Sequence, residues 1–207
     1  MRSVTGNSIK FGVMKIFLPS QSVAFFATIV ICSFYSCSPK NGDATENATV
    51  VPITAFENVD PAVKSQLATF LTGYFVLNQA LISDSLAGAK VAAGKLSETA
   101  KKFEMSKLTG EQMDFYFVQS SKLKGALQEI SESDDIEKAR GGLATVSEAM
   151  YGLAKAFHPN ESPLYYQYCP MARNNQGANW LSATKELVNP YMGQMMPECG
   201  RTQEKLD

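Results

Sequence analysis

Between residues 61 and 157, apolar residues recur at alternating spacings of three and four positions, in four separate segments. This spacing places each set along one stripe of a helix, so the pattern predicts four amphipathic helices. The four sets are Val63, Leu67, Phe70, Tyr74, Leu77 and Leu81; Leu86, Ala89, Ala93, Leu96, Ala100 and Phe103; Tyr116, Leu123, Leu127 and Ile130; and Ile136, Ala139, Leu143, Val146, Met150, Leu153 and Phe157.

Capping signals mark the ends of these predicted helices. Asp60 precedes Pro61, a cap followed by proline at the first helical position. The sequence Thr-Gly-Glu-Gln from position 109 fits a capping box, and Ser-Asp-Asp at 133–135 precedes the fourth stripe. The fourth helix is expected to end near Phe157, because a proline at 159 disfavours helical geometry in the residue before it.

Four amphipathic helices with short connections can bury their stripes only against one another. The predicted fold is therefore all-α, an up-down-up-down four-helix bundle. Gly141 and Gly142 fall inside the fourth helix, where glycine is unfavourable, and indicate either close packing or a bend.

The C-terminal segment, Pro163–Gly200, has no sustained period. It is expected to be largely irregular, with a short helix around Ser182–Val188, and to pack on the bundle through its aromatic side chains. These include the only tryptophan of the chain, Trp180.

Composition narrows the classes of function. The formal net charge is −1, which argues against a nucleic-acid partner. The chain has a single histidine, so multi-histidine zinc sites and histidine-based triads are disfavoured. Because no nucleophile–base pair or phosphate loop is evident, an enzyme is not expected.

The first 37 residues have the features of an export signal. Basic residues precede an apolar run at Val23–Ile31, and Ser36, Cys37 and Ser38 follow. This arrangement resembles a bacterial lipoprotein signal, in which Cys37 would carry the lipid. The alternative is an uncleaved signal anchor from Ile16 to Ser36, and Met14 is a second candidate start.

Both interpretations place the rest of the chain outside the cytoplasm, tethered to a membrane by lipid or anchor. The expected location is periplasmic, or that of an outer-membrane lipoprotein if Cys37 is lipidated. The expected organisation is a leader at 1–37, a flexible linker at 38–58, a helical domain at 59–200 that includes the C-terminal segment, and a tail at 201–207.

Two cysteine–methionine pairs in the C-terminal segment are candidate metal ligands. Cys169 and Met171 flank a proline, and Met196 and Cys199 are three positions apart. Thiolate and thioether are soft donors, and mixed sites of this kind select Cu(I). His158 is a further candidate that would add an imidazole.

Other readings of the same residues remain open. Cys169 and Cys199 would equally well form a disulfide in an oxidising compartment, closing a loop of about 30 residues. His158 suits a helix end. We interpret Met192 and Met195 as gap-filling core residues.

Four motifs follow one another in the C-terminal segment: Tyr-x-x-Tyr-Cys-Pro-Met-Ala, Gly-Ala-x-Trp-Leu-Ser, Asn-Pro-Tyr-x-Gly and Met-x-x-Cys-Gly. In this order they resemble the bacterial domain of unknown function 3347, over roughly Pro61 to Cys199. The resemblance implies an exported or lipid-anchored helical domain, also found fused to periplasmic adaptor subunits of copper and silver efflux pumps.

That context implies heavy-metal efflux components as partners. Cys169-Pro170-Met171 is also similar to the Cys-Pro-Met of short heavy-metal-binding domains, where histidine usually follows. Here Ala172 follows, which leaves the site one donor short. The expected function is soft-metal binding in the cell envelope. The alternative is a non-metal interaction module locked by a Cys169–Cys199 disulfide.

Overall fold

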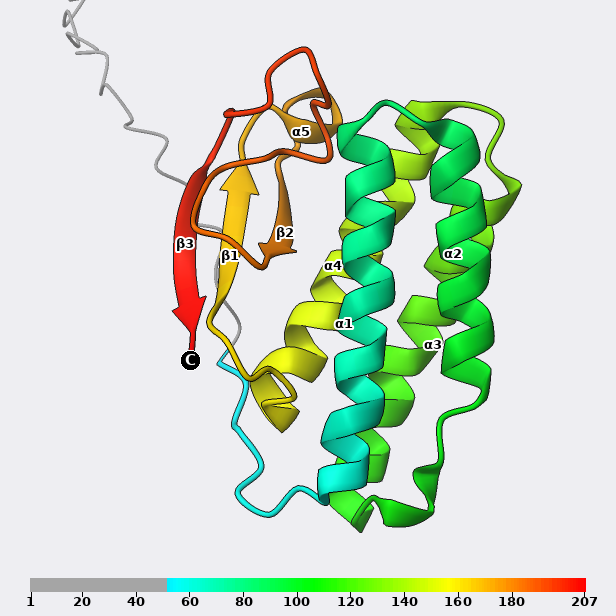
Figure 1. Cartoon of the computed structure of the whole chain (residues 1–207), viewed down its shortest axis with the longest axis vertical. Helices are drawn as coiled ribbons and strands as arrows, with labels where there is room; N and C mark the ends of the chain where they lie inside the picture. Colours follow the sequence, from blue (N-terminus) through cyan, green and yellow to red (C-terminus); the bar gives the residue numbers. More distant parts are fainter. Residues whose placement is uncertain (1–51) are drawn as a thin grey trace, which may run out of the picture. The chain divides into compact units, whose positions relative to one another are not determined.

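The computed structural model describes residues 52–207, and most of them form four long helices that lie side by side (Figure 1). A single 3-10 turn, Met105–Lys107, interrupts the connection between the second and third helices. The long helices are α1 (Pro61–Ile82), α2 (Leu86–Lys101), α3 (Gly110–Glu132) and α4 (Ile136–Phe157).

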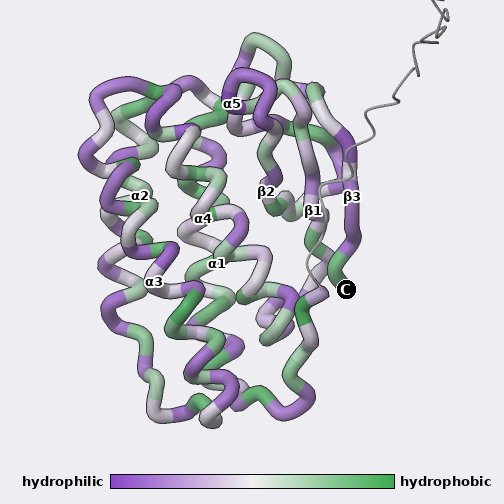
Figure 2. The backbone as a smooth tube through the Cα atoms, turned by 180° about the vertical axis from the view of Figure 1, so that it is seen from behind, coloured by the Kyte–Doolittle hydropathy of each residue, from purple (hydrophilic) through white to green (hydrophobic). Residues whose placement is uncertain are grey.

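The predicted stripes form the shared core of these helices. Every residue of the first set is buried along α1, and along α4 all of the predicted set except half-buried Ile136 are buried. Figure 2 shows the corresponding mixture of apolar and polar positions along each helix. The predicted caps also form: the Asp60 carboxylate accepts from the Ala62 N–H at 2.8 Å, and Thr109 and Gln112 make the capping box.

Gly142 lies where α4 approaches α3 closely. Of the two explanations for the glycine pair, close packing and a helix bend, this position supports close packing. A methyl group at this position would lie 2.8 Å from Cγ1 of Ile130 and 3.3 Å from the Ala126 carbonyl oxygen. Gly141, one residue earlier, has no such neighbour within 4 Å. The Gly-Gly pair therefore serves packing, and only its second member is required.

The C-terminal part of the chain contains a small three-stranded antiparallel sheet in the order β2-β1-β3, so the fold is mostly helical rather than all-α as expected. Outside two of these strands and one short turn, the segment Pro163–Gly200 is irregular, as expected. The four-residue turn α5 (Ala172–Asn175) lies between the first two strands, and its Arg173 and Asn174 have left-handed backbone angles. The strands are β1 (Leu164–Cys169), β2 (Ala178–Ser182) and β3 (Arg201–Leu206).

Two further expectations for the end of the chain were wrong. Residues 183–186 form bends, so no helix spans Ser182–Val188. Residues 201–207, which the sequence set apart as a tail, contain β3, and this strand pairs with β1. The folded unit therefore continues to the end of the described chain.

The sheet lies between α4 and the loop formed by residues 183–199 (Figure 1). On the helix side, the ring of Tyr166 stacks on Tyr151 of α4, with centroids 3.9 Å apart. On the opposite face, the Gln167 side-chain N–H group donates to the carbonyls of Lys185 and Glu186. The strand β1 is consequently covered on both faces, which explains why it does not show a polar face in the sequence.

The free edge of β2 is closed by side chains from α1. The Leu181 N–H donates to the Tyr74 hydroxyl at 3.0 Å, and the Leu181 carbonyl accepts from the Asn78 amide at 3.1 Å. The Tyr74 hydroxyl also lies 2.8 Å from that of Ser147 on α4. These bonds attach the sheet to two helices at once.

Residues 52–58, the end of the predicted flexible linker, pack on the bundle. The Phe56 N–H donates to the Ala156 carbonyl at 2.8 Å, and its ring contacts those of Phe157 and Phe115. The leader and the proposed lipidation residue Cys37 lie outside the described residues. Within residues 52–207, no helix has the length and apolarity needed to cross a bilayer.

The two glycines of α4 make a matched pair for a stability test. We expect Gly142→Ala to lower the free energy of unfolding by about 1–2 kcal/mol, because overpacking against Ile130 outweighs the gain in helix propensity. We expect Gly141→Ala to raise it by about 0.5–1 kcal/mol. Urea denaturation followed by circular dichroism measures both; equal effects would contradict the packing role of Gly142.

Candidate functional site

The structure brings together the two cysteines of the C-terminal segment. Cys169 is the last residue of β1 and Cys199 lies just before β3, and their Sγ atoms are 2.7 Å apart. Cys169 is fully buried and Cys199 half-buried, and both are free cysteines. The pairing of β1 with β3 therefore creates a dithiol from residues 30 positions apart.

This separation lies between the two states expected from the sequence. A disulfide has its sulfurs about 2.05 Å apart. Two thiolates that each lie about 2.3 Å from one tetrahedral metal ion stand about 3.8 Å apart. At 2.7 Å the two sulfurs are neither bonded to each other nor spaced to chelate one ion, so either state requires them to move.

Both predicted methionine ligands lie in the turns next to the cysteines. Met171 precedes α5 and is 46% exposed, and its backbone N–H hydrogen-bonds the Cys199 sulfur. The carbonyl of Met196, a half-buried residue, accepts from the Cys199 N–H at 3.1 Å.

Met195 was predicted to fill a gap in the core, and this is wrong. Its side chain is 80% exposed, whereas Met192 packs against the core as expected. Met195 lies in the same loop as Cys199, four positions before it. No periodic pattern in this loop distinguished a buried methionine from an exposed one.

His158 is not brought to this site. It caps the C-terminal end of α4, where its N–H donates to the Ala154 carbonyl and its backbone is left-handed. Cys169 lies at the far end of β1 from this helix end (Figure 1), and the strand's six residues span about 16 Å. The helix-end interpretation of His158 therefore fits its position, and the ligand interpretation does not.

Asn189, the first residue of the Asn-Pro-Tyr-x-Gly motif, positions Cys199. Its side-chain N–H donates to the Cys199 carbonyl at 2.7 Å, and its side-chain oxygen accepts from the Tyr191 N–H at 2.8 Å. Its own N–H donates to the Pro197 carbonyl at 2.8 Å. One fully buried side chain thus joins the beginning and the end of the loop that carries Cys199.

Arg140 of α4 fixes the middle of the same loop. Its guanidinium donates to the Pro190 carbonyl at 3.0 Å and to the Asp84 carboxylate at 2.6 Å. The Arg140 hydrogen bond holds the pKa of Asp84 below its usual value. A side chain at Gly193 would lie 2.0 Å from Asp84, and Gly193 has a φ of +53°, so only glycine suits this clamp.

The surroundings of Cys199 favour the protonated form of its thiol. Burial raises the pKa of the Cys199 thiol to about 11, and the adjacent Cys169 thiol contributes in the same direction. The Met171 backbone N–H acts in the opposite direction, because it stabilises a thiolate. Near neutral pH the Cys199 thiol is therefore protonated rather than an activated nucleophile.

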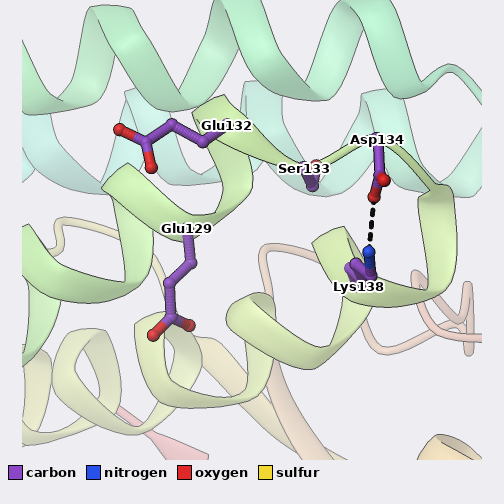
Figure 3. A pocket seen from close by; sticks show the side chains of 5 residues that line it. All are labelled: Glu129, Glu132, Ser133, Asp134 and Lys138. Atoms are coloured by element: carbon purple, nitrogen blue, oxygen red, sulfur yellow. Dashed lines mark hydrogen bonds and ion pairs between the residues drawn. The ribbon is translucent and has the colours of Figure 1, made fainter. Parts of the chain in front are cut away.

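The other surface hollows offer no comparable pair of candidate ligands. The one at the α3–α4 turn is lined by Glu129, Glu132, Ser133, Asp134 and Lys138, and Asp134 is already paired with Lys138 at 2.6 Å (Figure 3). Across residues 52–207, no group of three or more His, Cys, Asp or Glu side chains is arranged to hold a metal ion.

Comparison with known proteins assigns the helical part of this scaffold. Residues 70–162 match the family described as Protein of unknown function (DUF3347). This region belongs to the DUF3347 family. The match runs from α1 to the residues after α4 and stops before β1, so it does not include the cysteine motifs that suggested the resemblance. No curated protein and no solved structure matches the chain.

The raised pKa of Cys199 predicts how this thiol reacts with alkylating agents. We expect its rate of reaction with iodoacetamide to rise until about pH 11, because only the thiolate attacks. Cys169→Ala removes the neighbouring thiol and is expected to lower the midpoint. Peptide-resolved mass spectrometry of the reduced protein measures the rate. A midpoint at or below pH 9 in the unmodified protein would contradict the buried environment.

Proposed function

We propose that this protein is an exported, membrane-tethered module that binds a soft metal ion, Cu(I) in the first place, through Cys169 and Cys199. The observation that carries the proposal is the meeting of these two thiols at one end of the sheet. Methionines stand in both flanking turns. Met171 and Met196 are the secondary ligands, and Met195 is an additional donor at the surface.

We propose a soft ion because the available donors are sulfur atoms. Thiolate and thioether sulfur bind Cu(I) well and bind hard cations poorly. To chelate, the two sulfurs separate from 2.7 Å to about 3.8 Å. Cys169 is fixed in β1, so this change falls on half-buried Cys199. Binding displaces the thiol protons, so apparent affinity increases with pH.

The remaining parts of the proposal concern where the site works. The leader at 1–37, with Cys37 as the lipidated residue or as part of an anchor, places the module in the cell envelope. In this proposal the four helices form the up-down-up-down bundle favoured by their short connections. The protein passes the ion to heavy-metal efflux components or shields it from the envelope, as the family resemblance implies.

Titration with Cu(I) against a competing chelator tests the metal site. We expect Cys169→Ser/Cys199→Ser to lower the affinity of the reduced protein by roughly 100-fold or more, about 2.8 kcal/mol. Met171→Leu and Met196→Leu are expected to have smaller effects, since thioethers are the secondary donors. Met192→Leu is the matched control because Met192 packs in the core. If the unmodified protein and all of these variants bound Cu(I) equally weakly, the proposed copper site would be wrong.

The 2.7 Å separation itself favours a second candidate, a non-metal interaction module locked by a Cys169–Cys199 disulfide. The disulfide forms by exchange with an external disulfide. Two protein thiols and one oxidised glutathione give the protein disulfide and two molecules of reduced glutathione. The bond would fix the end of β1 to the start of β3.

Intact-mass measurement separates the two candidates. With oxidised glutathione, the locked module is expected to lose two hydrogen atoms and to gain up to about 3–4 kcal/mol of stability from a closed loop of 30 residues. Cys199→Ser is expected to show neither change. Retention of free thiols under these conditions, together with tight Cu(I) binding, would leave the metal site as the function.

A further inference from the structure

The two cysteines of the dithiol differ in their exposure to solvent. Cys169 is fully buried, whereas Cys199 is only partly buried. The two residues before Cys199, Pro197 and Glu198, are exposed, and so is Met171, whose backbone N–H hydrogen-bonds the Cys199 sulfur. A molecule that stays outside the protein can therefore approach Cys199 and cannot approach Cys169.

The elements that carry the two cysteines also differ in what their movement would break. Cys169 ends β1, the central strand of the sheet, and is paired there with Ala178 of β2. Cys199 lies in the turn before β3, where its N–H donates to the Met196 carbonyl. Exposing Cys169 would disrupt the sheet, whereas a movement of the Cys199 side chain breaks no strand pairing.

The buried thiol lies directly against the accessible one. The Sγ atoms of Cys169 and Cys199 are 2.7 Å apart. In thiol–disulfide exchange, a thiolate must reach the sulfur atom that it attacks. Any group that becomes bonded to the Cys199 sulfur from the solvent side is therefore within reach of Cys169 from the buried side. The Met171 N–H assists at the outset, because it stabilises a thiolate at Cys199.

We propose that the dithiol exchanges with small external disulfides in a fixed order, in which Cys199 is the attacking thiol and Cys169 the resolving thiol. The inference deepens the proposed function, since it rests on the same pairing of the two cysteines. It assigns to this site a substrate class, low-molecular-weight disulfides, of which oxidised glutathione is the probe used below.

The exchange has two steps, and each breaks one sulfur–sulfur bond and forms another. The Cys199 thiolate first attacks oxidised glutathione, which gives a mixed disulfide at Cys199 and releases one glutathione thiolate. The Cys169 thiolate then attacks the Cys199 sulfur, closes the protein disulfide and expels the second glutathione thiolate. The protein loses two electrons and two thiol protons, and the two glutathione molecules gain them.

The order links this chemistry to the metal site. A mixed disulfide at Cys199, or the closed disulfide, leaves no pair of free thiolates to chelate an ion. A metal ion held by both cysteines in turn occupies the Cys199 sulfur and prevents the first step. Small disulfides and the metal ion therefore compete for the site, and both act first at Cys199.

Peptide mapping of the full chain in detergent tests the order, because trypsin separates the cysteines. Cleavage after lysine and arginine places Cys169 in peptide 156–173 and Cys199 in peptide 186–201, and the leader cysteines fall in peptide 16–40. The reduced protein is mixed with oxidised glutathione at about pH 8, where thiolate is available. Samples are quenched with acid and analysed by mass spectrometry. We expect the earliest adduct at Cys199, in at least tenfold excess over Cys169.

Two single variants isolate the steps. Cys169→Ser is expected to accumulate a stable mixed disulfide at Cys199, which the unmodified protein converts to the internal disulfide. Cys199→Ser is expected to acquire glutathione at Cys169 at least tenfold more slowly. Circular dichroism checks that both variants fold, and the early adduct of the unmodified protein decides the order if either does not. Equal or faster modification of Cys169, or no adduct at Cys199, would overturn the proposal.

Cu(I) separates a failure of this order from a failure of the metal site. We expect one equivalent of Cu(I) to slow adduct formation at Cys199 of the unmodified protein by at least tenfold. If Cys199 reacts first but Cu(I) gives no protection, the fixed order stands and the metal site is wrong. If the first adduct forms at Cys169, the fixed order is wrong whether or not Cu(I) protects.

Discussion

The structure depends on satisfying the backbone of β2 where its edge meets the helices. An unpaired strand edge that is buried costs about 1–3 kcal/mol for each lost hydrogen bond. The Tyr74 hydroxyl, the Asn78 amide and the Tyr191 hydroxyl supply these bonds to Leu181 and to the Asn179 carbonyl. Ser147 stands between the two tyrosines and links α1, α4 and the sheet. Together these side chains form a polar seam that fixes β2 against α1 and α4.

Burial within this seam also determines its ionisation. Desolvation raises the pKa of Tyr74 above its ordinary value, although hydrogen bonds from Ser147, Asn78 and Leu181 act against the rise. The pKa of Tyr191 is raised well above its ordinary value for the same reason. Both hydroxyls therefore remain protonated across the physiological range and serve as permanent donors and acceptors. The hydrogen bonds that these two hydroxyls make are therefore insensitive to pH in that range.

The helices were predictable from sequence because each buries one stripe and leaves the rest of its surface in water. The period of Val63 to Leu81 and the caps at Asp60 and Thr109 were sufficient to locate them. The strands were not predictable in this way. Tyr166 packs on α4 while neighbouring Gln167 is buried beneath loop 183–199, so β1 shows no alternation of apolar and polar residues. β3 is charged and mostly exposed, and only its pairing with β1 reveals it as a strand.

The cysteine pair was only partly predictable from the sequence, unlike the helices, which were predictable, and the strands, which were not. The chemistry of Cys169 and Cys199 was readable from residue type, and their pairing followed once both were assigned to one segment. What holds them was not readable, since Asn189 and Arg140 act through backbone carbonyls distant in sequence. These contacts also limit what the dithiol can do. Because β1 holds Cys169 and Asn189 holds the Cys199 backbone, the sulfurs adjust mainly through the Cys199 side chain. In either of the proposed functions, a change in sulfur spacing would therefore fall on the Cys199 side chain rather than on the sheet.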